Sequence, residues 1–145
     1  MFERIMIATD GSKHSERAAE WGIELAKCSG GNIIAVYVAD TGRLSHLPED
    51  MALASIRDLL LREGEEATEQ IEKMVNLAGL VCIKKVLEGN PGEELLHFSD
   101  EEGADLIVLG ACGRTGLDKF LLGSVAEKVV RAAKVPVLTV PGERS

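Results

Sequence analysis

Short apolar runs alternate with segments of helical periodicity along the chain, and this alternation constrains the fold more than any other feature. Five runs have the pattern of strands and end at glycine, proline or polar residues, and the first two are typical of buried strands. They cover residues 5–8, 33–38, 81–87, 104–109 and 135–140. The helical periodicity lies between them, over residues 12–28, 49–77, 90–102 and 124–133.

A strand–helix alternation of this kind predicts a parallel sheet, because each helix carries the chain back to begin the next strand in the same direction. With right-handed crossovers, it predicts an α/β fold. We expect a doubly wound, Rossmann-like sheet of five parallel strands in the order 3-2-1-4-5, with helices on both faces. The sequence contains no repeat, low-complexity tract or linker, so we expect residues 1–145 to form one domain.

The acidic composition excludes several classes of partner. A formal net charge of −8 is unfavourable for nucleic acid, which requires a basic face, and for anionic lipid. No apolar run is long enough to span a membrane, and residue 1 is followed almost at once by a strand pattern rather than a signal peptide. We therefore expect a cytoplasmic protein that binds neither nucleic acid nor membranes.

The cysteines and histidines do not indicate a metal site or a disulfide framework. Cys28, Cys82 and Cys112 are odd in number and far apart, and the three histidines lack the spacing of metal ligands. Only 3% of the residues are aromatic, which disfavours a flavodoxin-like electron carrier because few rings are available to stack on a flavin. Cys112 has cationic neighbours in sequence, and redox sensing through its thiol is an alternative to a simple turn residue.

The predicted strand order places a candidate ligand site between strands 1 and 4. Ligands of open parallel sheets bind outside the carboxyl ends of the strands, where the winding reverses. Strand 1 ends at Asp10 and strand 4 ends at Gly110. The turn after strand 4 has a pattern of small residues, formed by Gly110, Gly113, Gly123 and Ser124.

This turn is suited to phosphate. Glycines allow backbone N–H groups to approach an anion, and Gly123 and Ser124 open a helix whose N-terminus attracts negative charge. Arg114 lies between the glycines and can offset phosphate charge. The alternative is that the glycines end a strand and that Ser124 is an ordinary helix cap.

Two further residues have a functional and a structural interpretation. The carboxylate of Asp10 can accept hydrogen bonds from both hydroxyls of a ribose, or it can form an Asx turn before the first helix. Val38 can pair with adenine through its backbone and cover the ring with its side chain, or it can be a core valine. Neither GxGxxG nor GxxxxGK[ST] occurs at the expected place, so a dinucleotide-binding Rossmann enzyme and a P-loop NTPase are disfavoured.

The chain resembles the universal stress protein family over nearly its whole length. The resemblance lies in residues 5–12, 89–91, 104–110, 123–126 and 135–138. Gly110, Gly113, Gly123 and Ser124 also match the pattern G-2x-G-9x-G-[ST] of the ATP-binding branch.

The resemblance implies a regulatory, stress-response module that binds ATP, or ADP or AMP, with Mg or Mn as a possible companion. It assigns phosphate and ribose to the motif residues, ribose to Asp10 and the adenine pocket to Ala8 and Val38. Val125, next to Ser124, belongs to the same predicted site. The resemblance also implies a homodimer formed through the last strand, Val137 to Val140. The alternative function is a slow ATPase or phosphotransferase that uses the same site.

Overall fold

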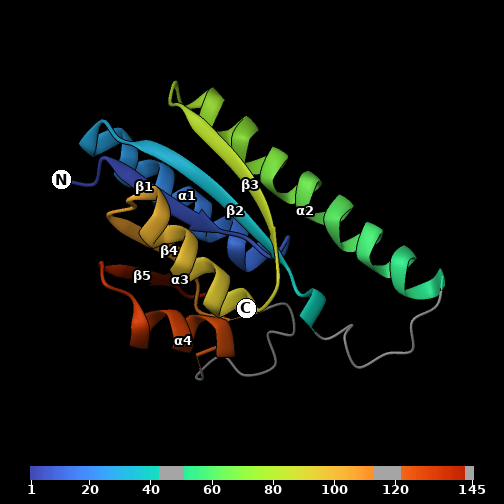
Figure 1. The fold of residues 1–145 in the computed structure, drawn as a ribbon. Helices are drawn as coiled ribbons and strands as arrows, with labels where there is room; N and C mark the ends of the chain where they lie inside the picture. Colours follow the sequence, from blue (N-terminus) through green and yellow to red (C-terminus); the bar gives the residue numbers. More distant parts are fainter. Residues whose placement is uncertain (43–50, 113–121, 143–145) are drawn as a thin grey trace.

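The computed structural model describes residues 1–42, 51–112 and 122–142, and the side chains of residues 51 and 52 are not described. Within these residues, five strands and four helices alternate as the sequence predicts (Figure 1). Their order is β1 (Arg4–Ala8), α1 (Lys13–Ser29), β2 (Asn32–Ala39), α2 (Met51–Leu77), β3 (Cys82–Glu88), α3 (Pro91–Glu102), β4 (Leu106–Gly110), α4 (Ser124–Ala132) and β5 (Val137–Val140).

The strands form one parallel sheet in the order β3-β2-β1-β4-β5, which confirms the predicted topology. β1 is central, with β2 on one side and β4 on the other. Ile5, for example, pairs with Ile33 of β2 and with Leu106 of β4. β3 and β5 are the two edges of the sheet, and the winding reverses between β1 and β4.

Two helices cover each face of the sheet, and the alternation of side chains in β1 shows how (Figure 1). Ile5 and Ile7 pack in a cluster with residues of α1 and α2. Met6 and Ala8 point to the opposite face and pack in a second cluster with residues of α3 and α4. Because side chains of a strand alternate between faces, an uninterrupted apolar run serves both clusters.

The long helix α2 lies close to β2 because Gly64 has no side chain. A Cβ at this position would be 2.5 Å from Cδ1 of Tyr37, whose ring is 5% exposed. The hydroxyl of Tyr37 also bonds to Oε2 of Glu63 at 3.0 Å. Gly64 therefore gives α2 room to pack on the ring of Tyr37.

An ion pair joins the first half of α2 to the end of β3. Nε and Nη2 of Arg57 donate to Oε1 and Oε2 of Glu88 at 2.6 and 2.9 Å. These hydrogen bonds and the opposite charge lower the pKa of Glu88 and raise that of Arg57. Both side chains are exposed, so the pair contributes little to the stability of the fold.

One detail of the predicted packing of α4 is wrong. The apolar pattern places Val125, Val129 and Val130 on the inner face, and Val129 is indeed fully buried. Val130 is 47% exposed, because the 100° turn per residue carries it past the edge of the face that Val129 occupies.

Among the described residues, no helix is long and apolar enough to cross a membrane.

Candidate functional site

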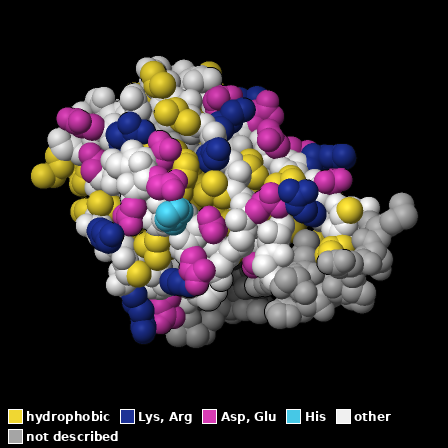
Figure 2. All heavy atoms as spheres, in the orientation of Figure 1, with side chains coloured by type: hydrophobic (Ala, Val, Ile, Leu, Met, Phe, Trp, Pro, Cys, Tyr) yellow, Lys and Arg dark blue, Asp and Glu magenta, His cyan; other side chains and the backbone are white. Residues whose placement is uncertain are grey.

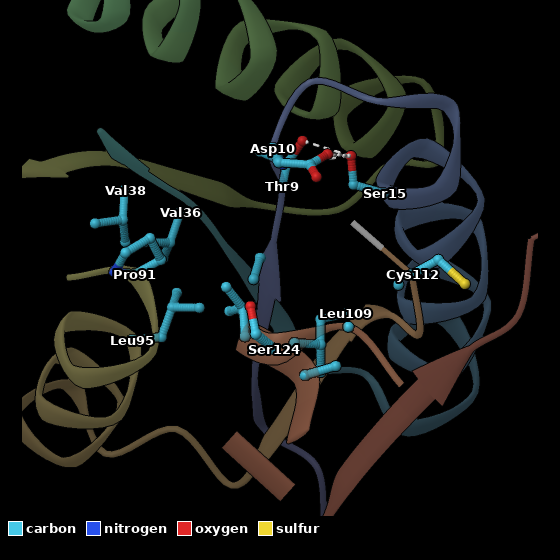
Figure 3. Close-up of a pocket in the computed structure, with 15 residues that line it drawn as sticks. Thr9, Asp10, Ser15, Val36, Val38, Pro91, Leu95, Leu109, Cys112 and Ser124 are labelled. Atoms are coloured by element: carbon cyan, nitrogen blue, oxygen red, sulfur yellow. Dashed lines mark hydrogen bonds between the residues drawn. The ribbon is translucent and has the colours of Figure 1, made fainter. Parts of the chain in front are cut away.

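A cavity of about 160 Å³ opens where the winding of the sheet reverses (Figure 3). After β1 the chain passes to α1 on one face, and after β4 it passes to α4 on the other, which leaves a crevice beyond the carboxyl ends of the two strands. Its walls come from β1, α1, β2, α3, β4 and α4 and from the residues that follow β1 and β4. The cavity therefore lies where the strand order predicts it.

We call this cavity the apolar chamber, because aliphatic side chains line one half of it. Val36 and Val38 of β2 face Leu95 of α3 across it, and Ala8 and Leu109 close the side formed by β1 and β4. Val125 of α4 lines it as well. The chamber thus brings together Ala8 and Val38, which were predicted for an adenine pocket, and Val125, which was predicted for the same site, while Val36, Leu95 and Leu109 were missed.

The carboxylate of Asp10 lies at the polar end of the same cavity. Its Oδ1 accepts hydrogen bonds from the backbone N–H of Ser12 at 2.9 Å and from the hydroxyl of Ser15 at 3.1 Å. The first bond is the Asx turn that the sequence left as an alternative. No hydrogen bond to Oδ2 forms within the described residues, so the Asx turn leaves one carboxylate oxygen for a ligand.

Ser15 is the residue that organises this end of the cavity, and the sequence analysis assigned it no function. Its side chain is buried, and its hydroxyl lies 3.0 Å from Oγ1 of Thr9 as well as within bonding distance of Asp10. Ser12 caps α1 by accepting a bond from the backbone N–H of Ser15. The available signal was a group of polar residues directly after a buried strand.

The N-terminus of α4 supplies unpaired backbone donors. The N–H of Gly123 bonds to the carbonyl of Ala111 at 2.7 Å, and the first helical hydrogen bond runs from Glu127 to Gly123. The N–H groups of Ser124, Val125 and Ala126 therefore have no partner among the described residues. All three residues line the cavity, and such amides, at the positive end of a helix dipole, attract an anion.

Ser124 is not the N-cap of α4, which was the structural alternative to a role in phosphate binding. The N-cap residue is Gly123, which has no side-chain cap bond, and Ser124 is the first residue of the helix. The hydroxyl of Ser124 is therefore not used as an N-cap. Ser124 instead lines the cavity, with its side chain labelled in Figure 3.

The structure gives Gly110 a different role from the one argued from backbone freedom. Gly110 and Gly123 both have φ values open to any residue. A Cβ on Gly110 would lie 3.3 Å from the backbone carbonyl carbon and oxygen of His14, so this glycine allows α1 to pack close to the end of β4. Gly113 and Arg114, the other predicted residues of this turn, lie outside the described residues.

A second, polar chamber of about 440 Å³ adjoins the first. The two share Pro91, Ser124 and Val125. The polar chamber is also lined by Asp40, Gly42, Asn90, Gly92 and Lys128. Sequence reasoning missed this chamber, although Lys128 follows Ser124 by four residues and so lies on the same face of the helix.

The described residues contain no cluster of three or more His, Cys, Asp or Glu side chains that could hold a metal ion. Asp10 and Asp40 are the carboxylates that line the two chambers within the described part of the chain, one in each chamber. Within the described residues, each chamber therefore offers a metal ion a single carboxylate side chain.

The sheet order and the crossover cavity together define a class, the doubly wound α/β proteins whose ligand site lies at the carboxyl ends of the strands. Comparison with known sequences narrows this class. Residues 1–141 match the model of the universal stress protein family, and the chain belongs to that family.

Individual relatives cover the whole fold. Universal stress protein MJ0531 of Methanocaldococcus jannaschii is 41% identical over 140 residues, which span 97% of this chain and 82% of that protein. The solved structure of MJ0577 from the same organism has a TM-score of 0.88 and 28% identity and covers 100% of this chain and 99% of that one. A universal stress protein solved in complex with cAMP has a TM-score of 0.69 and 26% identity, with 97% of each chain covered.

Proposed function

We propose that the cavity binds an adenine nucleotide. The observation that carries the proposal is that an apolar chamber opens directly onto three unpaired amides of the α4 N-terminus. A flat base suits the aliphatic walls, and a phosphate suits the amides. The family supports the same ligand class, since a relative was solved in complex with cAMP.

The proposal gives each part of the cavity a role. Ala8, Val38 and Val125 contact the base, and Oδ2 of Asp10 accepts from the ribose. Ser124 and the backbone at Gly110 and Gly123 surround the phosphates. Gly113 and Arg114, which lie outside the described residues, complete the phosphate site. ATP is the proposed ligand, with ADP or AMP as alternatives, and Mg or Mn would be held mainly by the phosphates.

We propose a regulatory, stress-response role that depends on binding rather than on turnover. A slow ATPase or phosphotransferase would use the same site and would need a base to activate its nucleophile. Within the described residues, Asp10 is the only carboxylate that lines the apolar chamber, and Ser12 and Ser15 already bind one of its oxygens. This arrangement favours a nucleotide sensor.

The proposal also includes a homodimer and a cytoplasmic location. β5 is a sheet edge, and an apolar edge is suited to pairing with a second copy. Cys28 is an exposed free thiol, which fits a reducing compartment.

The direct test is to release small molecules from freshly purified protein, identify them by mass spectrometry, and titrate the stripped protein with ATP by calorimetry. Val38→Trp, which fills the apolar chamber, is expected to abolish binding. Val81→Trp adds the same ring at a position that is 60% exposed and lines neither chamber, and it is expected to bind as wild type does. Equal affinities of the two variants would refute the assignment of the base to this chamber.

A further inference from the structure

The side chain of Lys128 lines the polar chamber and extends from α4 to α3. Its Nζ lies 3.0 Å from Oε1 of Glu93, in the first turn of α3. A Cβ on Gly92 would be 2.7 Å from Cδ of Lys128, so the aliphatic stem of the lysine lies directly on the backbone of that glycine. The absence of a side chain at Gly92 thus leaves space for the lysine between the two helices.

Lys128 is also the only cationic residue among the described residues that line either chamber. The chambers contain the carboxylates of Asp10 and Asp40, and the whole chain has a formal net charge of −8. Among the described lining residues, a phosphate that enters therefore meets two carboxylates and one cationic side chain, beside the amides of α4. A nearby positive side chain lowers this electrostatic cost.

We propose that Lys128 is an exchangeable phosphate ligand, which pairs with Glu93 in the free protein and with a phosphoryl oxygen of the nucleotide in the complex. This inference rests on the nucleotide site proposed above. Ser124 and Val125 line the polar chamber together with Lys128, so a phosphate at their amides lies on the same side of α4 as the lysine.

The ion pair has the properties that an exchange of partners requires. The side chains of Lys128 and Glu93 are 42% and 67% exposed, and an ion pair in water is weak. A lysine is a point charge on a flexible stem, so it can turn from a carboxylate to a phosphate without moving the helix. Glu93 is then a competitor of the ligand, and Lys128 favours ligands that carry phosphate over the free nucleoside.

The test compares the dissociation constants of ATP, AMP and adenosine for four proteins at low salt. Lys128→Gln is expected to raise the dissociation constant of ATP by about 3–10-fold and to leave that of adenosine within about twofold of wild type. This is the effect that loss of one partly exposed charge contact predicts. Glu93→Gln is expected to tighten ATP binding, since it removes the competitor. Lys128→Arg, which keeps the charge, is expected to retain most of the ATP affinity.

Lys134→Gln is the matched control. Lys134 also forms an exposed ion pair with α3, with Asp100 at 3.3 Å, but it lines neither chamber. Its loss is expected to leave all three affinities unchanged. Equal ATP affinity of Lys128→Gln and Lys134→Gln would overturn the role of Lys128 while leaving the nucleotide site intact, and an equal loss of adenosine and ATP would show that Lys128 only shapes the pocket. Failure of wild-type protein to bind any of the three ligands would instead refute the proposed function itself.

Discussion

The hydroxyl of Ser15 donates a hydrogen bond of 3.1 Å to Oδ1 of Asp10, and the backbone N–H of Ser12 donates a second one of 2.9 Å to the same oxygen. Both donors lie on the side of α1, so they orient the carboxylate with one oxygen bound and the other without a partner in the described residues. Asp10 therefore combines the two roles that its sequence position left open, because each oxygen of the carboxylate can serve one of them.

This geometry predicts that Asp10→Ala weakens ATP binding by about 1–3 kcal/mol, through the loss of charged hydrogen bonds to the ribose. Ser15→Ala removes only one of the two bonds that orient the carboxylate, and its effect is expected to be smaller. Calorimetric titration measures both affinities. Asp58→Ala removes an exposed carboxylate from α2 and serves as the charge control. An affinity of Asp10→Ala as high as that of Asp58→Ala would contradict the role of Asp10.

The edge strand β5 allows a specific test of the homodimer. The carbonyls of Pro136 and Val140 accept bonds from the N–H groups of Ile107 and Ala111, so alternate residues of this strand direct their backbone groups toward β4. Thr139 lies between them in this alternation and directs its N–H to the open edge. Thr139→Pro removes that donor without breaking a bond to β4.

Thr139→Pro is therefore expected to reduce the mass in solution from that of two chains to that of one, as measured by light scattering after size exclusion. Thr139→Val keeps the donor at the same position and is expected to remain dimeric. A monomeric wild-type protein would argue against the homodimer, and a dimeric Thr139→Pro would place the interface elsewhere.

The close contact between Gly64 and Tyr37 predicts an effect of unusual sign. A Gly-to-Ala change inside a helix normally stabilises by about 1 kcal/mol. In α2, the new methyl group would lie 2.5 Å from the buried ring, and overpacking of this kind costs about 1–3 kcal/mol. Gly64→Ala is expected to lower the free energy of unfolding in urea, and the same change in a Tyr37→Leu background is expected to be less harmful. A more stable single variant would contradict the packing argument.

Cys82 predicts a pH dependence of stability. Burial, assisted by the nearby charge of Glu72, raises the pKa of its thiol from 9.0 to about 11. The unfolded chain ionises this thiol at lower pH than the folded protein does, so the contribution of Cys82 to stability is complete below pH 9 and is lost between about pH 9 and 11.

The measurement is denaturant unfolding of wild-type protein and Cys82→Ala across this pH range. As the pH rises, the unfolding free energy of the wild type is expected to fall relative to that of Cys82→Ala. Titrations common to both proteins cancel in this difference. Curves that stay parallel from pH 8 to 11 would show that the thiol ionises equally in both states.

The fold could be predicted almost completely from the sequence, because the three inner strands β1, β2 and β4 are buried on both faces and are therefore continuous apolar runs. β3 was the least regular of the predicted strands, since Lys84 and Lys85 interrupt its apolar pattern. The structure extends it without a break from Cys82 to Glu88, and charged side chains are tolerated there because β3 is a sheet edge. β4 begins at Leu106 rather than at residue 104, and the carboxylate of Asp105 instead accepts bonds from the N–H groups of Glu3 and Arg4.

The site could be predicted only in outline. Strand order indicates which chain ends meet, and so it placed Asp10 near Gly110 and Ser124. It does not indicate which side chains of a neighbouring helix close the cavity, and Leu95 of α3 and Lys128 of α4 were missed for this reason. The spacing of the glycines predicted where the turn lies, but it did not predict why residue 110 is a glycine. In the structure, Gly110 makes room for the backbone of His14.

The walls of the cavity come from two separate stretches of the chain. Ala8, Asp10 and Val38 precede α2, whereas Leu95, Ser124 and Val125 follow it. A chain divided between β2 and α2 would therefore yield two fragments, each carrying an incomplete site. A nucleotide that contacts both fragments would hold them together, so nucleotide binding and reassociation of the fragments would be one coupled equilibrium.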